Sequence, residues 1–361
     1  MSIAPTHNLA DDKEVGFLDQ TLRPSRWDDY IGQKNIKDNL HILLTAAKER
    51  EHPPEHILFY GPPGLGKTTL AHLISKETGT QMKVTSGPAI VKVGDLASIL
   101  TNLSPGDILF IDEIHRLNKA IEEVLYPAME SGNLDIIIGK GPSARTLQLD
   151  LPPFTLIAAT TRIAMISSPL RSRFSGGVFK LEFYSETEIG EIIKRSAHIL
   201  GIEIHNDAVT EIAKRSRFTP RTANYHLKRC RDYAQINKTS LTKEVVEKAL
   251  SMLGVDIIGL TPADREILKV IITKFKGGPV GLNTIAAALS EVCGAAERTR
   301  IQLRQRTCRC VARDQEATKH DGRNERRIRP PRDRVEVFLL RTQVAPAVHD
   351  PEAPQERSSD H

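Results

Sequence analysis

The sequence has 361 residues, of which 40% are hydrophobic and 26% are charged, so it can bury the cores of about two or three domains. No apolar run is long enough to span a membrane, and the first residues lack the pattern of a secretion signal. The four cysteines lack the spacing of a zinc site; they are Cys230, Cys293, Cys308 and Cys310. These features argue against a membrane or secreted protein and predict a cytoplasmic one with reduced thiols.

The formal net charge of +5 is concentrated near the end of the chain. Residues 298–334 contain thirteen Lys and Arg but five Asp and Glu, an excess of eight positive charges. The rest of the chain has 37 basic and 40 acidic residues, and therefore a charge of −3. Net charge thus gives no argument that the main body of the protein binds nucleic acid.

Residues 1–20 have no periodic apolar pattern and are predicted to form a flexible leader. Apolar residues recur at helical spacing between residues 36 and 44, which predicts an amphipathic helix that ends near Arg50. Because a phosphate-binding loop follows this helix, the segment before it is expected to pack over the base of a nucleotide.

That loop is Gly61-Pro-Pro-Gly-Leu-Gly-Lys67-Thr68-Thr69, which follows a short apolar strand and leads into a helix. Its glycines let backbone N–H groups turn toward a phosphate chain, and the helix directs its positive end to the same place. Lys67 can reach the terminal phosphates, and the Thr68 hydroxyl is placed to bind Mg²⁺. The alternative, a glycine-rich turn without a ligand, does not account for the strand and the helix on either side.

A second apolar strand, residues 106–111, ends in the carboxylates Asp112 and Glu113. In a parallel sheet these carboxylates would lie beside the phosphate loop. Asp112 would then reach the Mg²⁺ ion, and Glu113 would reach the water that attacks the γ-phosphate. An Asp at a helix start followed by a Glu is the ordinary alternative. The phosphate loop upstream favours the functional interpretation.

Further strands are predicted near 82–85 and 155–161, and helices near 96–103 and 119–130. Residues 134–149 alternate in period two on both sides of a Gly-Pro turn, which predicts a β-hairpin. The alternation of strands and helices predicts an α/β fold with a doubly wound parallel sheet and the nucleotide at the carboxyl ends of the strands.

From residue 185 the pattern is helical only, and four helices are predicted up to residue 255. The third opens at Thr219-Pro220-Arg221. Another helical unit is predicted at 256–291. Residues 292–361 are rich in Arg and Pro without apolar periodicity, which predicts disorder.

Several motifs together identify a family. Between about Leu22 and Glu291 the sequence resembles the RuvB family of bacterial Holliday-junction branch-migration motors. Besides the phosphate loop, the matching motifs are Asp112-Glu-Ile-His-Arg-Leu117, Leu149-Asp-Leu-Pro-Pro-Phe154, Ala159-Thr-Thr-Arg162, Ser168-Pro-Leu-Arg-Ser-Arg-Phe174 and Gly277-Gly-Pro-Val-Gly-Leu282. The resemblance implies an AAA+ fold, with a large P-loop ATPase domain at 21–184, a helical lid at 185–255 and an incomplete winged-helix domain at 256–291.

The resemblance also implies roles for single residues in binding ATP and Mg²⁺. Thr160 would sense the γ-phosphate, Arg173 would act as an arginine finger on a neighbouring subunit, and Arg221 would be a second sensor. The metal would be bound by Thr68 and Asp112, with Glu113 at the water. The remaining nucleotide contacts would be Leu22, Arg23, Gly64, Lys67, Thr68, Thr69, Glu130, Ser131, Gly132 and Tyr184.

The implied partners are double-stranded and four-way junction DNA, five further copies in a homo-hexameric ring, and a RuvC-like resolvase in the wider complex. The hairpin at 134–149 would dock a RuvA-like junction-binding protein, and no membrane is involved. The implied location is the bacterial cytoplasm.

Alternatives remain for individual features and for the whole chain. Arg173 could form an ordinary surface ion pair, Arg221 could merely occupy a helix N-terminus, and the hairpin could be a sheet edge covered by the same chain. A clamp-loader-type ATPase would share the sheet, the lid and the arginine finger, although its lid leads into a helical collar. A third possibility is an ATP-binding module with defective engagement of DNA.

The sequence departs from the family in two places. The segment 174–179 is one residue longer than the family's turn, next to Arg173. After Glu291, the family's aromatic-containing recognition helix and its Thr-Pro-Arg-Gly-Arg wing are absent from the sequence. The Arg-rich replacement resembles an out-of-frame translation, a hypothesis that resequencing the locus would test.

Deleting residues 292–361 is therefore expected to leave basal ATP turnover nearly unchanged. It should remove a sequence-independent affinity for DNA that decreases with salt. In a plot of the logarithm of the binding constant against the logarithm of the salt concentration, the slope should steepen by about one unit per phosphate contact. ATPase assays and DNA titrations at several salt concentrations would measure both quantities. Junction-specific binding that survives high salt would contradict this expectation.

Overall fold

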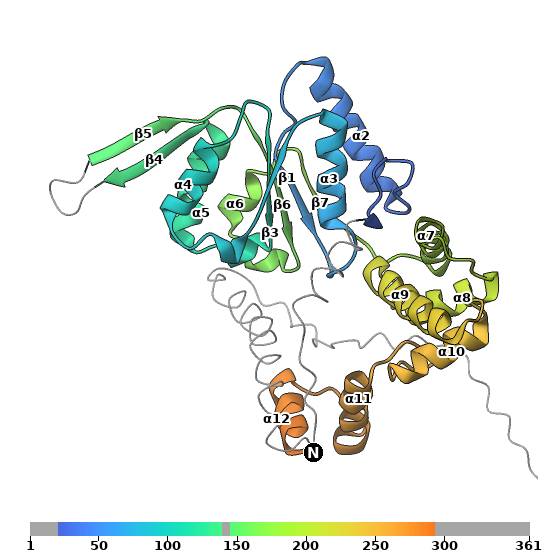
Figure 1. Cartoon of the computed structure of the whole chain (residues 1–361). Helices are drawn as coiled ribbons and strands as arrows, with labels where there is room; N and C mark the ends of the chain where they lie inside the picture. The colour runs from blue at the N-terminus through green and yellow to red at the C-terminus, as the bar shows by residue number, and fades with distance from the viewer. Residues whose placement is uncertain (1–20, 139–144, 293–361) are drawn as a thin grey trace, which may run out of the picture. The chain divides into compact units, whose positions relative to one another are not determined.

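The computed structural model describes residues 21–138 and 145–292 (Figure 1). The predicted leader, the tip of the predicted hairpin and the segment predicted to be disordered, from residue 293 onward, lie outside these residues. The described residues fall into two compact units, which are divided between Leu268 and Lys269. The first unit contains the predicted ATPase domain and the predicted lid.

Five parallel strands form the central sheet in the order β2-β3-β6-β1-β7, which confirms the doubly wound α/β fold. Tyr60 of β1 pairs with Thr160 of β6, and Ser86 of β2 pairs with Asp112 of β3. Because the strands are parallel, the loops after them meet at one edge, where such sheets bind ligands. The strands are β1 (Ile57–Tyr60), β2 (Met82–Ser86), β3 (Ile108–Asp112), β6 (Thr155–Thr160) and β7 (Gly177–Lys180).

Successive residues of the central strands face two different hydrophobic cores, one on each side of the sheet. In β1, Ile57 and Phe59 belong to the first core, and Leu58 between them belongs to the second. In β3, Phe110 belongs to the first core and its neighbour Leu109 to the second. Burial on both sides explains why these strands read as continuous apolar runs.

Helices cover both faces of the sheet (Figure 1). The first core contains side chains of α2 (Lys34–Glu49) and α3 (Lys67–Thr78), and the second those of α4 (Val93–Thr101), α5 (Lys119–Glu130) and α6 (Ser168–Ser172). Helix α5 begins where the Asn118 side chain accepts the Ile121 N–H, 2.9 Å away, as a typical N-cap. Short 3-10 turns connect these elements: η1 (Gly87–Ala89), η2 (Ile114–Arg116) and η4 (Ile163–Met165).

The predicted hairpin is present and forms a sheet of its own. Strand β4 (Asn133–Ile138) pairs antiparallel with β5 (Arg145–Asp150), and Leu134 lies opposite Leu149. The two strands make no ladder with the central sheet, from which they project in Figure 1. Leu134, at the base, is fully buried in the second core, so the hairpin is anchored at one end.

Four helices form the lid: α7 (Glu186–Ile199), α8 (Asn206–Arg215), α9 (Pro220–Asn237) and α10 (Lys243–Met252). Helix α7 starts with a capping box, in which the Ser185 hydroxyl accepts the Glu188 N–H and the Glu188 carboxylate accepts the Ser185 N–H. Two helices follow, α11 (Pro262–Phe275) and α12 (Leu282–Val292). Within the described ranges, no helix combines the length and the apolar character needed to cross a membrane.

His226 of α9 is buried inside the lid, with 4% of its surface exposed. Its Nδ1 has no hydrogen-bond partner. Burial, followed by the nearby charges of Arg215 and Arg217, lowers the pKa of His226 to about 4. The imidazole is therefore neutral in the folded protein at pH values where an unfolded chain would be protonated.

This difference predicts acid sensitivity of the lid. Between pH 6.5 and about 4 the unfolded chain binds the extra proton, so the stability is complete above pH 6.5 and falls as the pH decreases through this window. The total effect should be about 3 kcal/mol. The variant His226→Leu should lose this part of the pH dependence in denaturant titrations, whereas the exposed His198→Gln should retain it. An unchanged slope in His226→Leu would refute the assignment.

Candidate nucleotide-binding site

The phosphate loop has the backbone that its glycines allow. Gly64 and Gly66 have φ values of 84° and 98°, in the region that side chains other than glycine rarely adopt. A Cβ atom on Gly64 would also lie 3.0 Å from the Cβ of Arg221. Helix α3 starts at Lys67 directly after Gly66, so its free N–H groups and positive dipole end belong to the same loop.

Lys67 is buried, with 7% of its surface exposed. Its Nζ donates hydrogen bonds to the carbonyl oxygens of Gly61 and Pro62, each 2.9 Å away. Burial lowers the pKa of Lys67, while the charges of Asp112 and Glu113 oppose that shift. The ammonium group is thus held inside the loop by neutral acceptors, in a place where a phosphate anion would interact strongly with it.

Asp112 and Glu113 lie at the carboxyl end of β3, beside the loop. The Asp112 Oδ1 accepts the Glu113 N–H at 3.0 Å, and Glu113 has a left-handed backbone with φ of 50°. The Glu113 Oε2 accepts the Thr161 hydroxyl at 3.0 Å and lies 3.1 Å from the His115 Nδ1. These contacts fix the direction of the carboxylate that the sequence assigns to the attacking water.

The two threonines at the end of β6 have different surroundings. Thr160 is completely buried, and its Oγ1 lies 3.0 Å from the His115 Nδ1 and accepts the Arg162 N–H at 2.9 Å. Thr161 lines the pocket and contacts Glu113. The sensor predicted at Thr160 therefore lies behind the pocket, and its neighbour is the residue that faces it.

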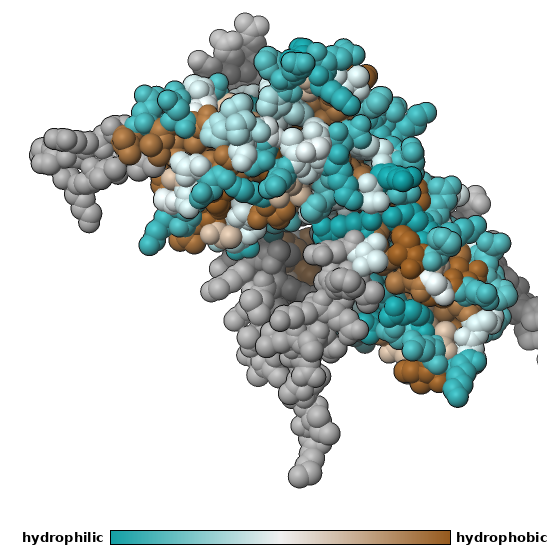
Figure 2. Space-filling view, turned by 45° about the horizontal axis from the view of Figure 1, so that its top comes forward, coloured by the Kyte–Doolittle hydropathy of each residue, from teal (hydrophilic) through white to brown (hydrophobic). Residues whose placement is uncertain are grey.

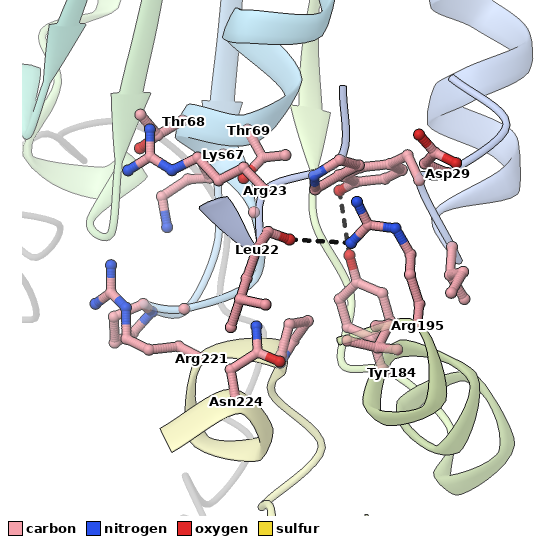
Figure 3. Close-up of a pocket in the computed structure, with 18 of the residues that line it drawn as sticks. Leu22, Arg23, Asp29, Lys67, Thr68, Thr69, Tyr184, Arg195, Arg221 and Asn224 are labelled. Atoms are coloured by element: carbon pink, nitrogen blue, oxygen red, sulfur yellow. Dashed lines mark hydrogen bonds between the residues drawn. The ribbon is translucent and has the colours of Figure 1, made fainter. Parts of the chain in front are cut away.

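The opposite end of the pocket is formed by the segment before α2 and by the lid (Figure 3). The Arg195 Nη1 of α7 donates to the Leu22 carbonyl oxygen at 2.9 Å and so attaches the segment to the lid. The Tyr184 hydroxyl lies 3.1 Å from the Leu65 carbonyl oxygen and 3.1 Å from the Tyr30 hydroxyl. Burial raises the pKa of Tyr184 to about 12, so this phenol remains neutral.

Arg221 stands at the start of α9, across from the loop. Its backbone N–H donates to the Gly64 carbonyl oxygen at 3.4 Å. The guanidinium is exposed, and Arg221 lines the pocket together with Asn224, as Figure 3 shows. A cation at a helix N-terminus is electrostatically unfavourable, and a phosphate in this pocket would remove that cost.

The pocket has a volume of about 250 Å³ and brings together ten of the predicted residues, from both the ATPase domain and the lid. Among the lining residues that were not predicted from the sequence are the polar residues Asp29, Thr161, Arg195 and Asn224. For Thr161, the pair of hydroxyls at the end of β6 was the available signal. The predicted residues brought together are Leu22, Arg23, Gly64, Lys67, Thr68, Thr69, Asp112, Glu113, Tyr184 and Arg221.

The structure does not bring the other predicted nucleotide contacts to this pocket. Glu130, Ser131 and Gly132 line a second cavity together with Arg173. There the Arg173 guanidinium forms an ion pair with Glu130 at 3.1 Å, donates to the Pro169 carbonyl oxygen at 2.7 Å and stacks over Tyr126. Residues 130–132 do not line the pocket at the phosphate loop, so the role predicted for them in binding a nucleotide stays a prediction.

Thr68 and Asp112 fit a magnesium ion in their chemistry and position. Both line the pocket, and a hydroxyl and a carboxylate are the oxygen donors that Mg²⁺ prefers. Asp112 has one oxygen engaged by the Glu113 N–H, which leaves the other for a cation. The ion would supply positive charge at the phosphates.

Comparison with known proteins agrees with this geometry. Three family models match consecutive parts of the chain: the Holliday junction DNA helicase RuvB P-loop domain at residues 22–180, the RuvB AAA lid domain at 184–256 and the RuvB C-terminal winged helix domain at 257–298. The chain belongs to the RuvB family. The last match extends beyond Glu291, where the resemblance seen in the sequence was expected to end.

Individual relatives support the same assignment to the RuvB family. The Holliday junction branch migration complex subunit RuvB of Dehalococcoides mccartyi (strain CBDB1) is 58% identical over 275 residues, which cover 76% of this chain and 78% of the relative. The Thermotoga maritima RuvB Holliday junction branch migration motor has a similar structure, with a TM-score of 0.68, 50% identity and coverage of 75% of this chain and 86% of that one. A variant of the Thermotoga maritima protein has a TM-score of 0.69, also at 50% identity.

The contacts of Lys67 and Glu113 predict different defects for the two residues. Lys67→Ala removes the buried charge at the phosphates and should weaken ATP binding at least about tenfold. Glu113→Gln keeps the shape but cannot accept a proton, and it should lower turnover by about 10² to 10⁴ with ATP still bound. Equilibrium binding of a labelled ATP analogue and steady-state turnover measure the two effects. Equal losses of affinity in both variants would contradict the assignment.

Proposed function

We propose that this chain is an ATP-hydrolysing DNA motor that drives branch migration of Holliday junctions during recombination and repair. The observation that carries the proposal is the meeting of Lys67, Asp112 and Glu113 in one pocket between the ATPase domain and the lid. Phosphoryl transfer needs mainly positioning and charge stabilisation, and these side chains supply both. Membership of the RuvB family gives the DNA substrate.

In the proposed reaction, the phosphate loop and Lys67 hold the β- and γ-phosphates of ATP. Thr68 and Asp112 would hold Mg²⁺, which would supply positive charge at the phosphates. Glu113 would accept a proton from the water as the water oxygen bonds to the γ-phosphorus, and ADP would leave. Thr161, the first residue after β6, donates its hydroxyl to the Glu113 carboxylate, and we assign it to the sensing of the γ-phosphate. Arg221 brings the lid against the same phosphates, so hydrolysis would change the position of the lid.

Arg173 is proposed to act on the ATP of a neighbouring subunit in a homo-hexameric ring. Two observations support this role. Arg173 lines a cavity that is separate from the nucleotide pocket of the same chain, and Glu130, Ser131 and Gly132 line that cavity with it. A surface with both an arginine and polar groups is suited to a nucleotide presented from outside. Residues 130–132 are accordingly assigned to the same neighbouring ATP.

The hairpin is proposed to dock a RuvA-like junction-binding protein. It projects from the central sheet, and Leu147 on β5 is 45% exposed. In Figure 2, hydrophobic residues, in brown, lie on the arm that projects at the left of the view. An exposed apolar strand pair is a suitable surface for a protein partner. The wider proposal includes a RuvC-like resolvase and a location in the bacterial cytoplasm.

The decisive experiment measures ATP turnover alone, with four-way junction DNA, and with junction DNA and a RuvA-like protein. Turnover that rises with both additions, together with strand exchange on the junction, is the expected result. A rate of ATP turnover that does not change with junction DNA would favour the alternative of an ATP-binding module that does not engage DNA. A protein that neither binds nor hydrolyses ATP would overturn the proposal completely.

The trans role of Arg173 predicts that two inactive variants can restore each other. Arg173→Ala keeps an intact pocket, and Lys67→Ala keeps an intact Arg173, so mixed rings contain some complete sites. Arginine fingers contribute about 10³ to 10⁵ in rate, so the recovered turnover should be easily measured. Arg171→Ala, a basic neighbour in α6, is the matched control and should be active by itself. Mixtures that give only the sum of the two inactive samples would exclude the trans role.

A further inference from the structure

The turn between α8 and α9 has an unusual backbone. Arg217 and Phe218 both adopt left-handed conformations, with φ values of 53° and 56°. Neither is glycine, so the conformation is unfavourable at both positions and requires support from the surroundings. Because the turn directly precedes Arg221, its shape decides where that residue stands relative to the phosphate loop.

One side of the turn is attached to the nucleotide pocket. The Phe218 carbonyl oxygen accepts the Tyr184 N–H at 3.1 Å, and the Tyr184 side chain lies against the Leu65 carbonyl oxygen of the phosphate loop. Three residues after Phe218, the Arg221 N–H donates to the Gly64 carbonyl oxygen. A shift of the phosphate loop would therefore be felt at the turn through two separate connections.

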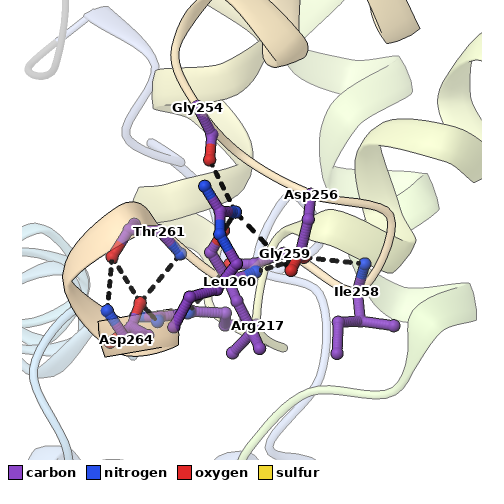
Figure 4. A network of polar contacts seen from close by, with 9 residues as sticks. Arg217, Gly254, Asp256, Ile258, Gly259, Leu260, Thr261 and Asp264 are labelled. Carbon is purple, nitrogen blue, oxygen red and sulfur yellow. Dashed lines mark hydrogen bonds and ion pairs between the residues drawn. The ribbon is translucent and has the colours of Figure 1, made fainter. Parts of the chain in front are cut away.

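The other side of the turn is attached to the linker that leads into α11 (Figure 4). The Arg217 Nε donates to the Gly259 carbonyl oxygen at 3.2 Å, and its Nη2 forms an ion pair with Asp264. The same Asp264 oxygen accepts the N–H of Thr261 at 2.9 Å and also its hydroxyl. One carboxylate thus joins Arg217 to the first turn of α11.

The linker itself is tightly fitted at this point. Gly259 has φ of 83°, and a Cβ atom there would lie 2.5 Å from the Arg215 carbonyl oxygen at the end of α8. The Asp256 Oδ1 accepts the N–H groups of Ile258 and Leu260, at 3.1 and 2.8 Å. The linker therefore presents the Gly259 carbonyl oxygen and Asp264 to Arg217 from a defined position.

We propose that Arg217 is a positioning residue that couples the nucleotide pocket to the start of α11, through the strained turn at 216–219 on one side and Gly259 and Asp264 on the other. The inference rests on the proposed function, which takes ATP as the ligand of the pocket to which the turn is attached. An exposed ion pair by itself contributes little to stability, so its value here is geometric. By linkage, anything that displaces α11 also changes the affinity of the pocket for ATP.

Arg265, which follows Asp264 in α11, provides a matched control. Its side chain is 43% exposed, close to the 44% of Arg217, and it also forms an ion pair, with Asp256 at 3.6 Å. Its Nη1 donates to the carbonyl oxygens of Gly254 and Leu260, at 2.9 and 3.0 Å. All these partners belong to the linker, so Arg265→Ala removes a comparable set of contacts without touching Gly259, Asp264 or the turn at 216–219.

The test uses the full chain, Mg²⁺ and a non-hydrolysable ATP analogue. In the parent protein, the analogue should slow hydrogen exchange of the backbone amides at 261–268. Arg217→Ala should lose this protection and bind the analogue at least about fivefold more weakly, while Arg265→Ala keeps both properties. If Arg217 only stabilised the fold, the analogue would still slow exchange at 261–268 in Arg217→Ala. Protection that persists in Arg217→Ala would overturn the inference.

Asp264→Asn gives a second measurement if Arg217→Ala does not fold. It removes the charge that Arg217 binds and keeps an oxygen for Thr261, so it should reproduce the loss of protection. Combining it with Arg217→Ala should add nothing, whereas additive losses would show that the two residues act separately. A parent protein that fails to bind the analogue would contradict the proposed function, and a parent that binds it without protection at 261–268 would contradict only the coupling.

Discussion

The buried charge of Lys67 is the constraint on which the site depends. An ammonium group removed from water is costly unless hydrogen bonds and opposite charges compensate. The Gly61 and Pro62 carbonyl oxygens and the neighbouring carboxylates supply that compensation in part. A phosphate chain would complete it, since a charge-assisted hydrogen bond is roughly twice as strong as a neutral one. The loop therefore holds its lysine ready for an anion before any ligand arrives.

The same pocket joins two domains, and this shapes its response to a ligand. The ATPase domain supplies the lysine and the carboxylates, while the lid supplies Arg195, Arg221 and Asn224. Among the described residues, the hydrogen bonds that connect the two sides include that of Arg195 to the Leu22 carbonyl oxygen and that of the Arg221 N–H to the Gly64 carbonyl oxygen. A triphosphate that contacts both walls would contribute more to their association than these bonds do, so ligand binding should favour one lid position.

Most of the fold and the centre of the site could be predicted because their signals are local. The phosphate loop, the strand that ends in Asp112, the hairpin and α9 each occupy one continuous stretch with its own periodicity or motif. Short elements such as β7 and α6 have too few residues for a pattern. Arg195 and Asn224 reach the pocket only through the packing of the lid, which no local pattern encodes. Thr160 is the last residue of β6, and Thr161 follows it directly. Adjacent residues of a strand face opposite ways, so the motif alone did not decide which of the two hydroxyls faces the pocket.

The contacts of Arg173 within its own chain are compatible with the role that we propose for it at the ATP of a neighbouring subunit. Its partner Glu130 has a side chain that is 61% exposed, and such ion pairs contribute about 0–1 kcal/mol because water screens them. The Tyr126 ring holds the guanidinium from one face without neutralising it. A γ-phosphate presented by a neighbouring subunit carries more charge than one carboxylate and offers a geometry that a guanidinium can bind with two parallel hydrogen bonds. In the proposed trans role, exchange of Glu130 for that phosphate would therefore cost little, because the guanidinium could keep its contact with the Tyr126 ring.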